Sequence, residues 1–484
     1  MRKKIFKLFF LLFGFNSIKI EGNKKGTIIV LIDGLSFKAL HYAINKKYCP
    51  TLKKLSATYS LSSYYCGLPA ATTATEALLF YGNNDNIPGF TWYDRQLKKF
   101  VRGNRSLELT EFEDSLKKKR NLLKDGSVIM GVYTGGATEL TISGRNLTFS
   151  RSANLLRTAH YFLMALLYPV QLTRTIYLTL KTLALYRGSH RHSAHETFST
   201  IVLGQFSCFM AEIEIMRNTE KIFVDFLLYD EYAHEYGPTH SNTLSTLRLI
   251  DRYVKRIIAT AKKTDRRYEI ILMSDHGQTE SIPFDFPIVR SIPDIKKALN
   301  DQSFEVIKTY GGTIPTKERN ELYVVPAGST LQLYFSHRLD TGFTESEINT
   351  QFPQFIQNLL TYAEFGWILV RQDNNSSVLY GKNGSVLFNT HTSPLVKGTP
   401  FADDALERQR ILDAFQRYST FPNNGDIVLF GNVMSNKKVY SFEKHKGTHG
   451  GFYGPMTKPF IMTKNPHVKG NSMATLFDTI AVTL

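Results

Sequence analysis

The chain has 484 residues, of which 43% are hydrophobic and 21% charged. This composition excludes a disordered chain and suits one large α/β domain with insertions, or two domains. Lys and Arg outnumber Asp and Glu by 59 to 42, a net charge of +17, which favours anionic partners such as phosphate substrates or anionic lipid. Because there is no Lys/Arg-rich block and no nucleic-acid-binding motif, we expect no nucleic-acid polymer as partner.

Residues 1–25 begin with Arg2, Lys3 and Lys4 and continue into the apolar run 8–15. This is the layout of a secretory signal peptide, and the run is too short for a comfortable transmembrane helix. No small-x-small cleavage site follows, so an uncleaved N-terminal anchor remains open. We therefore predict an extracytoplasmic protein whose folded part is 26–484.

The chain has three cysteines, Cys49, Cys66 and Cys208, and no CxxC pair. Neither a disulfide framework nor a thiolate zinc site is indicated. We expect all three to be buried as small apolar residues, although one disulfide with a free thiol is possible.

The first predicted strand is Thr27–Ile32, and it ends in Asp33-Gly34. Short apolar runs of this kind are typical of buried strands in a parallel sheet. In open α/β sheets, chemistry collects at the carboxyl ends of such strands. Asp33 is therefore a candidate ligand.

Residues 69–79, PAATTATEALL, predict a loop of small residues that opens a helix. Backbone N–H groups at a helix N-terminus bind anions. A Thr72 hydroxyl there would suit attack on phosphorus once a metal lowered its pKa. Taken alone, this stretch is better explained by a plain Thr N-cap, and Thr73 is a second hydroxyl at the next position.

Gly126–Tyr133 predicts another strand, and the insertion at 150–200 contains the apolar segment 157–187. Pro169 divides this segment, so neither half reaches a membrane span. We predict two amphipathic helices with basic edges, either packed on the domain or lying at an anionic membrane surface. The basic residues concerned are Arg157, Arg174, Lys181 and Arg187.

Lys221–Leu228 predicts a strand, and Asp230 and His234 follow it four residues apart. That spacing places both on one face of a helix, where they could hold one ion. A helix at Thr243–Ala261 leads into the strand Glu269–Met273.

The strand Glu269–Met273 ends in Ser-Asp-His-Gly. Zn²⁺ accepts both the carboxylate of Asp275 and the imidazole of His276 as ligands. A simple turn with an Asp cap is the alternative explanation of this motif. Farther on, we predict a strand-rich insertion at about 300–425 flanking the cleft. His449 then lies in a glycine-rich loop.

Seven residues thus follow predicted strands or begin a helix, so one cleft can collect them. Three carboxylates and three imidazoles are the ligands of two zinc ions. The predicted fold class is α/β, with a mostly parallel central sheet covered by helices on both faces. The seven residues are Asp33, Thr72, Asp230, His234, Asp275, His276 and His449.

Five motifs, LIDG, PAATTATEALLFYG, DEYAHEYGP, SDHGQ and GTHGG, resemble those of the alkaline phosphatase superfamily. Their order is most similar to the type I phosphodiesterase/nucleotide pyrophosphatase branch, including a membrane-associated bacterial subgroup. The resemblance implies an alkaline-phosphatase-like three-layer sandwich and a phosphoric ester hydrolase with a phospho-threonine intermediate on Thr72. It also implies that one Zn²⁺ is bound by Asp33, Thr72, Asp275 and His276, and the other by Asp230, His234 and His449.

The sequence departs from the family pattern after the nucleophile helix. Diesterases of the family usually carry there an Asn that contacts the phosphoryl oxygen, whereas this chain reads Gly89-Phe-Thr-Trp-Tyr-Asp-Arg95. We predict that Arg95 supplies the missing substrate contact. The alternatives are a phosphomonoesterase, a phospholipid head-group phosphotransferase, or a catalytically idle surface-binding protein on this fold.

Overall fold

The computed structural model describes residues 24–104, 106–143, 166, 168–186, 194–283, 291–301, 303–309, 315, 319–373, 375–399, 401 and 405–483. The predicted signal peptide or anchor at 1–25 therefore lies, apart from its last two residues, outside the described part of the chain. The same holds for 157–165 and for Arg187.

A seven-stranded sheet forms the lower lobe, in the order β2-β20-β8-β1-β7-β5-β6. The strands from β8 to β6 run parallel, whereas β20 and β2 are antiparallel to their neighbours. The sheet is thus mostly parallel, as predicted. Its strands are β1 (Lys25–Ile32), β2 (Ser60–Ser63), β5 (Ser127–Gly131), β6 (Thr141–Ser143), β7 (Lys221–Phe226), β8 (Arg267–Met273) and β20 (Phe460–Thr463).

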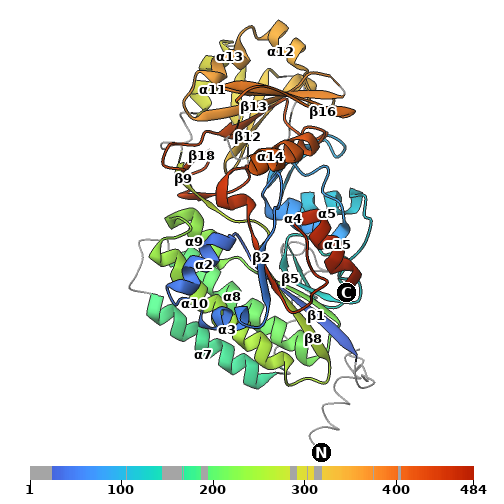
Figure 1. The fold of residues 1–484 in the computed structure, drawn as a ribbon, viewed down its shortest axis with the longest axis vertical. Helices are drawn as coiled ribbons and strands as arrows, with labels where there is room; N and C mark the ends of the chain where they lie inside the picture. Colours follow the sequence, from blue (N-terminus) through green and yellow to red (C-terminus); the bar gives the residue numbers. More distant parts are fainter. Residues whose placement is uncertain are drawn as a thin grey trace, which may run out of the picture.

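Helices cover both faces of this sheet (Figure 1). Alternate residues of β1 point to opposite faces: Ile28 and Val30 enter one hydrophobic core, while Ile29 and Leu31 enter another. The first core contains α2 (Phe37–Asn45), α3 (Pro50–Ser56), α8 (Ala194–Met216), α9 (Leu228–Tyr236) and α10 (Ser241–Ala261). The second contains α4 (Thr72–Tyr81), α5 (Ser106–Ser115) and α15 (Met473–Thr483). The predicted α/β three-layer arrangement is confirmed.

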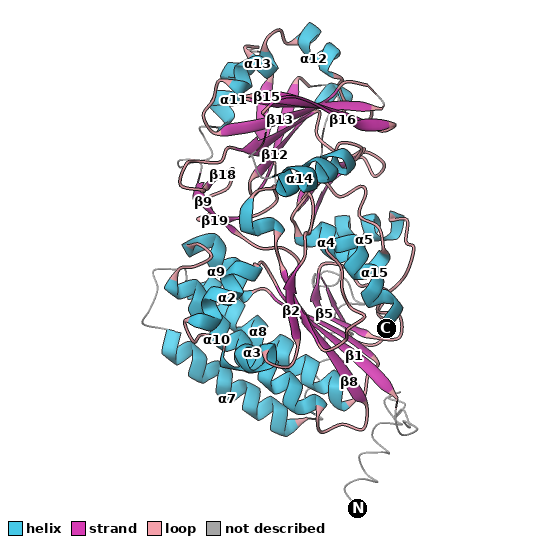
Figure 2. Cartoon of the chain, viewed as in Figure 1, coloured by secondary structure: helices cyan, strands magenta, loops and turns pink. Residues whose placement is uncertain are grey.

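An eight-stranded sheet forms the upper lobe, which we call the cap (Figure 2). Its order is β10-β11-β12-β17-β13-β14-β15-β16, and only the β10–β11 pair is parallel among the described strands. The strands are β10 (Glu305–Lys308), β11 (Glu321–Ala327), β12 (Thr330–Phe335), β13 (Phe365–Arg371), β14 (Ser376–Gly381), β15 (Gly384–Asn389), β16 (Thr392–Gly398) and β17 (Ile427–Gly431).

The cap has hydrophobic cores of its own on both faces of its sheet. One face packs against α11 (Ser291–Leu299), α12 (Glu345–Gln351) and α13 (Phe355–Leu360), and the other against α14 (Ala405–Tyr418). A three-stranded sheet, β18-β9-β19, lies between the lobes (Figure 2). It consists of β9 (Thr279–Pro283), β18 (Val439–Ser441) and β19 (Gly447–Thr448).

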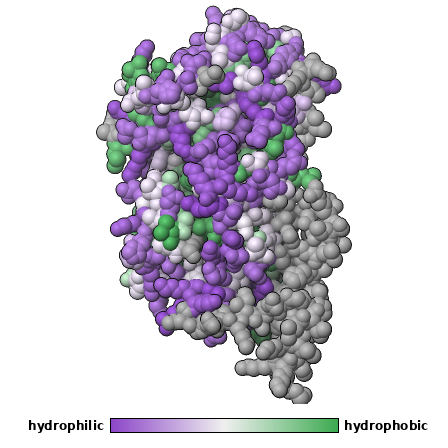
Figure 3. All heavy atoms as spheres, turned by 90° about the vertical axis from the view of Figure 1, so that its right-hand side faces the viewer, coloured by the Kyte–Doolittle hydropathy of each residue, from purple (hydrophilic) through white to green (hydrophobic). Residues whose placement is uncertain are grey.

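Helix α7 (Pro169–Tyr186) lies against α8 along the lower edge of the molecule, the end at which β1 begins (Figure 1). It begins at the proline that divides the apolar segment, as expected for proline in the first turn of a helix. Within the described residues, no helix is long and apolar enough to cross a membrane. The molecular face in Figure 3 is mostly hydrophilic where residues are described.

All three cysteines are buried and unpaired. Cys49 and Cys208 belong to one core of the lower lobe and Cys66 to the other. The prediction that they act as small apolar residues is confirmed.

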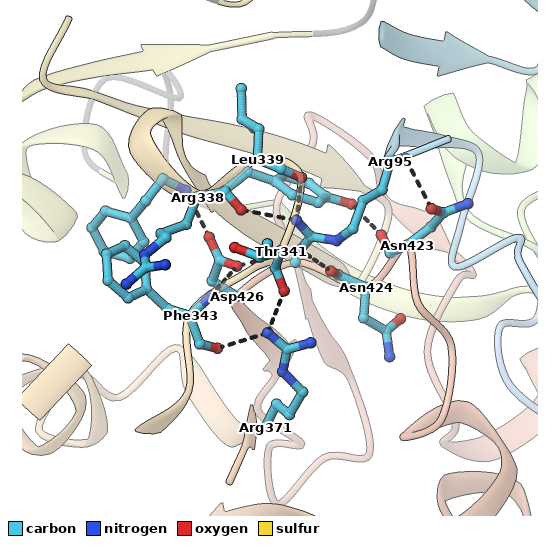
Figure 4. Close-up of polar contacts among 12 residues, drawn as sticks. Arg95, Arg338, Leu339, Thr341, Phe343, Arg371, Asn423, Asn424 and Asp426 are labelled. Atoms are coloured by element: carbon cyan, nitrogen blue, oxygen red, sulfur yellow. Dashed lines mark hydrogen bonds and ion pairs between the residues drawn. The ribbon is translucent and has the colours of Figure 1, made fainter. Parts of the chain in front are cut away.

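Arg95 lies away from the cleft, in a polar network that joins the cap to the hairpin of β3 (Thr91–Asp94) and β4 (Lys99–Arg102) (Figure 4). Its guanidinium donates to the backbone carbonyls of Pro422, Arg338, Leu339 and Asn424. It also forms an ion pair of 3.3 Å with the buried carboxylate of Asp426. The prediction that Arg95 contacts the substrate is therefore wrong, because its side chain binds the cap and does not line the cleft.

The geometry of the hairpin explains this outcome. Thr91 pairs with Arg102 at the open end of the hairpin, whereas Asp94 pairs with Lys99 next to its turn. Arg95 therefore begins the turn, and its donors are used by carbonyl groups of the cap.

We predict that Arg95→Ala lowers the free energy of unfolding by about 3 kcal/mol, because it removes the partner of a buried charge. Chemical denaturation of the purified protein measures the change. Arg338→Ala is the matched control: Arg338 pairs with Glu347 at the surface, and such pairs contribute less than about 1 kcal/mol. An Arg95→Ala protein of unchanged stability but lost hydrolysis would restore the substrate-contact interpretation.

Candidate metal centre

The seven predicted residues converge at the carboxyl end of the central sheet. They come from five turns or helices that meet at this end of the sheet, as the sheet topology requires. Asp33 follows β1, Thr72 is the first residue of α4, Asp230 and His234 lie on α9, Asp275 and His276 follow β8, and His449 follows β19. His234 and His449 are partly buried, and the other five are buried.

The first group of possible ligands consists of Asp33, Asp275 and His276, whose ligand atoms all lie within 4.8 Å of one another. Nε2 of His276 is 3.5 Å from Oδ1 of Asp33 and 3.2 Å from Oδ2 of Asp275. The hydroxyl of Thr72 lies 3.3 Å from the same Nε2 atom. A hydroxyl, two carboxylates and an imidazole therefore face one point.

The second group consists of Asp230, His276 and His449, again within 4.8 Å. His234 adjoins it, since its Nε2 atom is 3.0 Å from Oδ2 of Asp230. The rings of His276 and His449 stack with centroids 3.9 Å apart. His276 thus belongs to both groups, whereas the family resemblance assigns it to one metal.

Backbone carbonyls orient the three imidazoles. Nδ1 of His234 donates to the carbonyl of Gly447, Nδ1 of His276 to that of Gly277, and Nδ1 of His449 to that of Ala70, at 2.9–3.0 Å. A carbonyl oxygen only accepts, so Nδ1 carries a proton in each ring, and Nε2 is the nitrogen that can bind a metal when it is unprotonated.

The site also fits a cation electrostatically. Oδ1 of Asp33 and Oδ2 of Asp275 are buried without a hydrogen-bond donor. Burial, and then the charges of Asp275 and Asp230, raise the pKa of Asp33 well above its usual value. Hard oxygen and imidazole nitrogen donors in this arrangement suit Zn²⁺ or a similar divalent ion.

Asp230 and His234 behave as a buried ion pair. Although burial opposes it, the charge and hydrogen bond of His234 hold the pKa of Asp230 well below its usual value. Burial lowers the pKa of His234, but the charge and hydrogen bond of Asp230 outweigh it and raise this pKa to about 9. In the absence of metal, His234 therefore neutralises part of the negative charge of the site.

Gly34 allows the first turn of the site to form. Its φ angle is +70°, and a Cβ there would lie 2.1 Å from Oδ1 of Asp230. Its backbone N–H donates to Oδ1 of Asp275 at 3.2 Å. Only glycine permits this close approach of the backbone to two carboxylates.

A cleft of about 340 Å³ opens over this centre and contains residues that the sequence did not single out. Arg102 and Asn104 reach it from the open end of the β3–β4 hairpin, and Asp225 reaches it from β7. His445 also lines the cleft, with its ring 4.0 Å from that of His234. Asp225 could have been found from the sequence, because a carboxylate near the end of an apolar strand is unusual.

The cap contributes directly to the centre through the turn between β11 and β12. The backbone N–H and the hydroxyl of Ser329 both donate to the carbonyl oxygen of His449, at 2.9 and 3.0 Å. The N–H of Gly328 donates to the carboxylate of Glu443, another lining residue of the cleft. The position of His449 therefore depends on both lobes.

The chain matches the model of one protein family and is similar to solved structures at low sequence identity. The family model of type I phosphodiesterase/nucleotide pyrophosphatase matches residues 27–385. Phosphonoacetate hydrolase from Sinorhizobium meliloti, in complex with phosphonoacetate, superimposes with a TM-score of 0.50 at 14% identity, over 95% of each chain. Murine ectonucleotide pyrophosphatase/phosphodiesterase 5 gives a TM-score of 0.49 at 11% identity, over 95% of this chain and 94% of its own. Among curated protein sequences, none matches the chain.

We predict that the metal-free protein loses stability between pH 6.5 and pH 8. The pKa of His234 is raised to about 9 in the folded protein. The charged imidazole therefore stabilises the fold fully below the pKa that His234 has in the unfolded chain. This stabilisation declines as the pH rises toward 9. Asp33 also loses stability with rising pH, starting from the unfolded pKa of an aspartate, because burial and the charges of Asp275 and Asp230 raise its pKa in the folded state.

Thermal denaturation after chelation measures this effect, and we expect the melting temperature to fall by about 1–2 °C, because one titrating group acts against the large unfolding entropy of a long chain. Zinc-loaded protein is the control, since a bound metal keeps His234 neutral and compensates the carboxylates. The variant His234→Gln should lose part of the pH dependence. A metal-free melting temperature that is constant or rises over this range would contradict the prediction.

Proposed function

The chain belongs to the type I phosphodiesterase/nucleotide pyrophosphatase family, and we propose that it is a dizinc phosphodiesterase or nucleotide pyrophosphatase with Thr72 as nucleophile. Its membership makes it a hydrolase of phosphoric ester bonds with an alkaline-phosphatase-like fold. The observation that carries the finer proposal is the position of the Thr72 hydroxyl beside Asp33, Asp275 and His276.

Thr72 is favoured over its neighbour by where the two hydroxyls point. The Thr72 hydroxyl lies 3.3 Å from Nε2 of His276 and lines the cleft. The Thr73 hydroxyl donates to the carbonyl of Gly89 at 2.9 Å, and its side chain is fully buried. Thr73 is thus engaged in packing α4.

The proposed reaction uses few groups of the chain. Asp33, Asp275 and His276 would hold one divalent ion next to Thr72, and Asp230, His234 and His449 would hold the other. Metal ions bound there would lower the pKa of the Thr72 hydroxyl and neutralise charge on the phosphoryl oxygens. Thr72 Oγ would form a bond to phosphorus as the ester P–O bond breaks, and the leaving group would depart with a proton from solvent. Water would then hydrolyse the phospho-threonine, which releases the phosphate product and restores the Thr72 hydroxyl.

Two residues of the β3–β4 hairpin are suited to contact the phosphoryl group. Asn104 follows β4 and lines the cleft together with Thr72, as does Arg102. An amide N–H or a guanidinium N–H donates to phosphate oxygens. We propose that Asn104 takes the role that the sequence led us to assign to Arg95.

The cleft favours a diester over a monoester. Beyond the ligands it is lined by the apolar side chains of Phe90, Leu227 and Pro326, and its volume of about 340 Å³ leaves room for a group on each side of the phosphorus. Phosphomonoester hydrolysis and head-group transfer remain the alternative activities on the same residues.

We predict that Thr72→Ala lowers kcat on the order of 10³-fold or more while the protein keeps its zinc, because six other side chains supply ligands. The measurement is hydrolysis of nucleotide, glycerophosphodiester and aryl diester substrates, together with the metal content. Thr73→Ala is the matched control and should lose stability but keep turnover. Full activity after chelation, or an inactive Thr73→Ala beside an active Thr72→Ala, would refute the assignment.

We also propose that the protein lies outside the cytoplasm and contacts an anionic bilayer through α7. Val170, Tyr177 and Leu180 are 72%, 61% and 63% exposed, which is unusual for a helix packed on a domain. Arg174 and Lys181 are exposed beside them, where they could reach lipid head groups. The opposite side of α7 is anchored, since Arg256 donates to both buried Thr175 and Glu212 of α8.

Vesicle sedimentation of the full chain tests this surface. We predict that Ile176→Asn combined with Leu180→Asn weakens binding at all salt concentrations. Lys181→Glu should weaken binding to anionic vesicles at least about fivefold at low salt, since each basic side chain contributes about 1 kcal/mol. Leu395→Asn is the control, because Leu395 is 56% exposed but lies on the cap. Equal binding of all variants would exclude α7 as the contact.

A further inference from the structure

A second cleft, of about 660 Å³, lies between the two lobes, and none of its lining residues lines the cleft over the metal centre. It is formed where α14 of the cap faces α4 and α15 of the lower lobe (Figure 1). The segment 65–68 forms a further part of its wall. We call it the α14–α15 cleft. Its volume lies in the range of sites that hold small organic molecules.

Arg410 brings a positive charge without a partner into the α14–α15 cleft. Four basic and three acidic residues line this cleft. Two ion pairs of 2.7 Å use two charges of each sign: Arg417–Asp85 and Arg120–Asp478. The third acidic residue, Asp413, accepts a hydrogen bond from Gln409 at 2.8 Å. Arg410 is partly buried, and within the described part of the chain no residue forms a hydrogen bond or ion pair with its guanidinium.

The first turn of α15 opens into the same cleft. The N–H of Met473 donates to the carbonyl of Tyr65 at 2.9 Å. The N–H of Thr475 donates to the hydroxyl of Ser472 at 3.4 Å. Between them, the N–H of Ala474 has no acceptor among the residues that the structure describes. A free N–H at the positive end of a helix dipole attracts an anion.

Tyr65 is an independent sign that this cleft takes a ligand. It lines the cleft and is only 9% exposed, yet its hydroxyl is buried without a hydrogen-bond partner. Buried hydroxyl groups normally have one. Burial raises the pKa of this hydroxyl, and charges of α14, among them that of Arg410, also act on it. Since the backbone of Tyr65 pairs with Ser472 at the start of α15, Tyr65 lies between Arg410 and the free N–H of Ala474.

We propose that the α14–α15 cleft is a second ligand site, which binds an organic molecule that carries a phosphate group. The guanidinium of Arg410 and the N–H of Ala474 bind the phosphate, because both kinds of donor favour such anions. The Tyr65 hydroxyl donates to a phosphate oxygen and thereby gains the acceptor that it lacks.

The remaining wall of the cleft suits the organic part of this ligand. Leu68, Leu78 and Met473 line it with apolar side chains, together with Ala414 of α14. Apolar walls with a few placed polar groups are typical of small-molecule sites. A phosphate attached to an organic group should therefore bind more tightly than inorganic phosphate.

Calorimetric titration of the full chain with phenylphosphonate tests the proposal. This probe carries a phosphate-like dianion on an apolar ring and has no ester bond to hydrolyse. The zinc-loaded protein should bind two molecules per chain, one at the metal centre and one in the α14–α15 cleft. After chelation the carboxylates of the metal centre repel the anion, so the one molecule that still binds reports on the α14–α15 cleft. Inorganic phosphate should bind there at least about tenfold more weakly.

Variants assign this binding to the cleft. Arg410→Ala should weaken it at least about tenfold, because a charge-assisted hydrogen bond is lost. Tyr65→Phe keeps the ring and should weaken binding about fivefold. Arg408→Ala is the matched control, since it removes the same charge from α14 at a position that does not line the cleft. Its affinity should equal that of the wild type.

Three outcomes would overturn the proposal. They are the absence of binding after chelation, equal affinity of the wild type and Arg410→Ala, and inorganic phosphate that binds as tightly as phenylphosphonate, which would indicate an adventitious ion only. An unchanged zinc content shows that the variants are folded. The cleft does not depend on the metals, so a protein that binds no zinc would refute the proposed function and leave this site standing.

Discussion

Repulsion among buried carboxyl groups at one end of the central sheet is the constraint on which the site depends. Moving a carboxylate out of water costs several kcal/mol unless an opposite charge or hydrogen bonds compensate. The chain gives Asp230 a histidine, Asp275 a backbone N–H from Gly34, and Glu76 a backbone N–H from Val132. These contacts compensate only part of the charge. The rest of the fold keeps the carboxylates together, and cations make the arrangement favourable.

The convergence of the candidate ligands at one place could be predicted because it follows from strand topology. Asp33 comes directly after an apolar run and Asp275 one residue after another, and adjacent parallel strands bring such residues to one edge of the sheet. The helical spacing of Asp230 and His234 likewise fixes their common face. The parallel sheet and its two helical layers follow from the same apolar patterns.

Other parts of the site depend on contacts between distant segments, which no local pattern encodes. Whether Arg95 or Asn104 faces the cleft is decided by the turn of the β3–β4 hairpin and by cap carbonyls more than 200 residues away. The shared position of His276 in both ligand groups depends on the loop carrying His449. The sequence could suggest Asp225, but its lack of any donor is visible only in three dimensions.

The two hydrogen bonds from Ser329 to His449 have a mechanical consequence. A hinged upper lobe would carry the β11–β12 turn with it and pull His449 away from Asp230 and His276. Opening of the cap would therefore compete with metal binding by His449, so these two hydrogen bonds favour a cap that stays fixed over the cleft. A fixed cap would leave the width of the cleft constant. The cleft, which Arg102 and Asn104 line on one side, would then select substrates by their size.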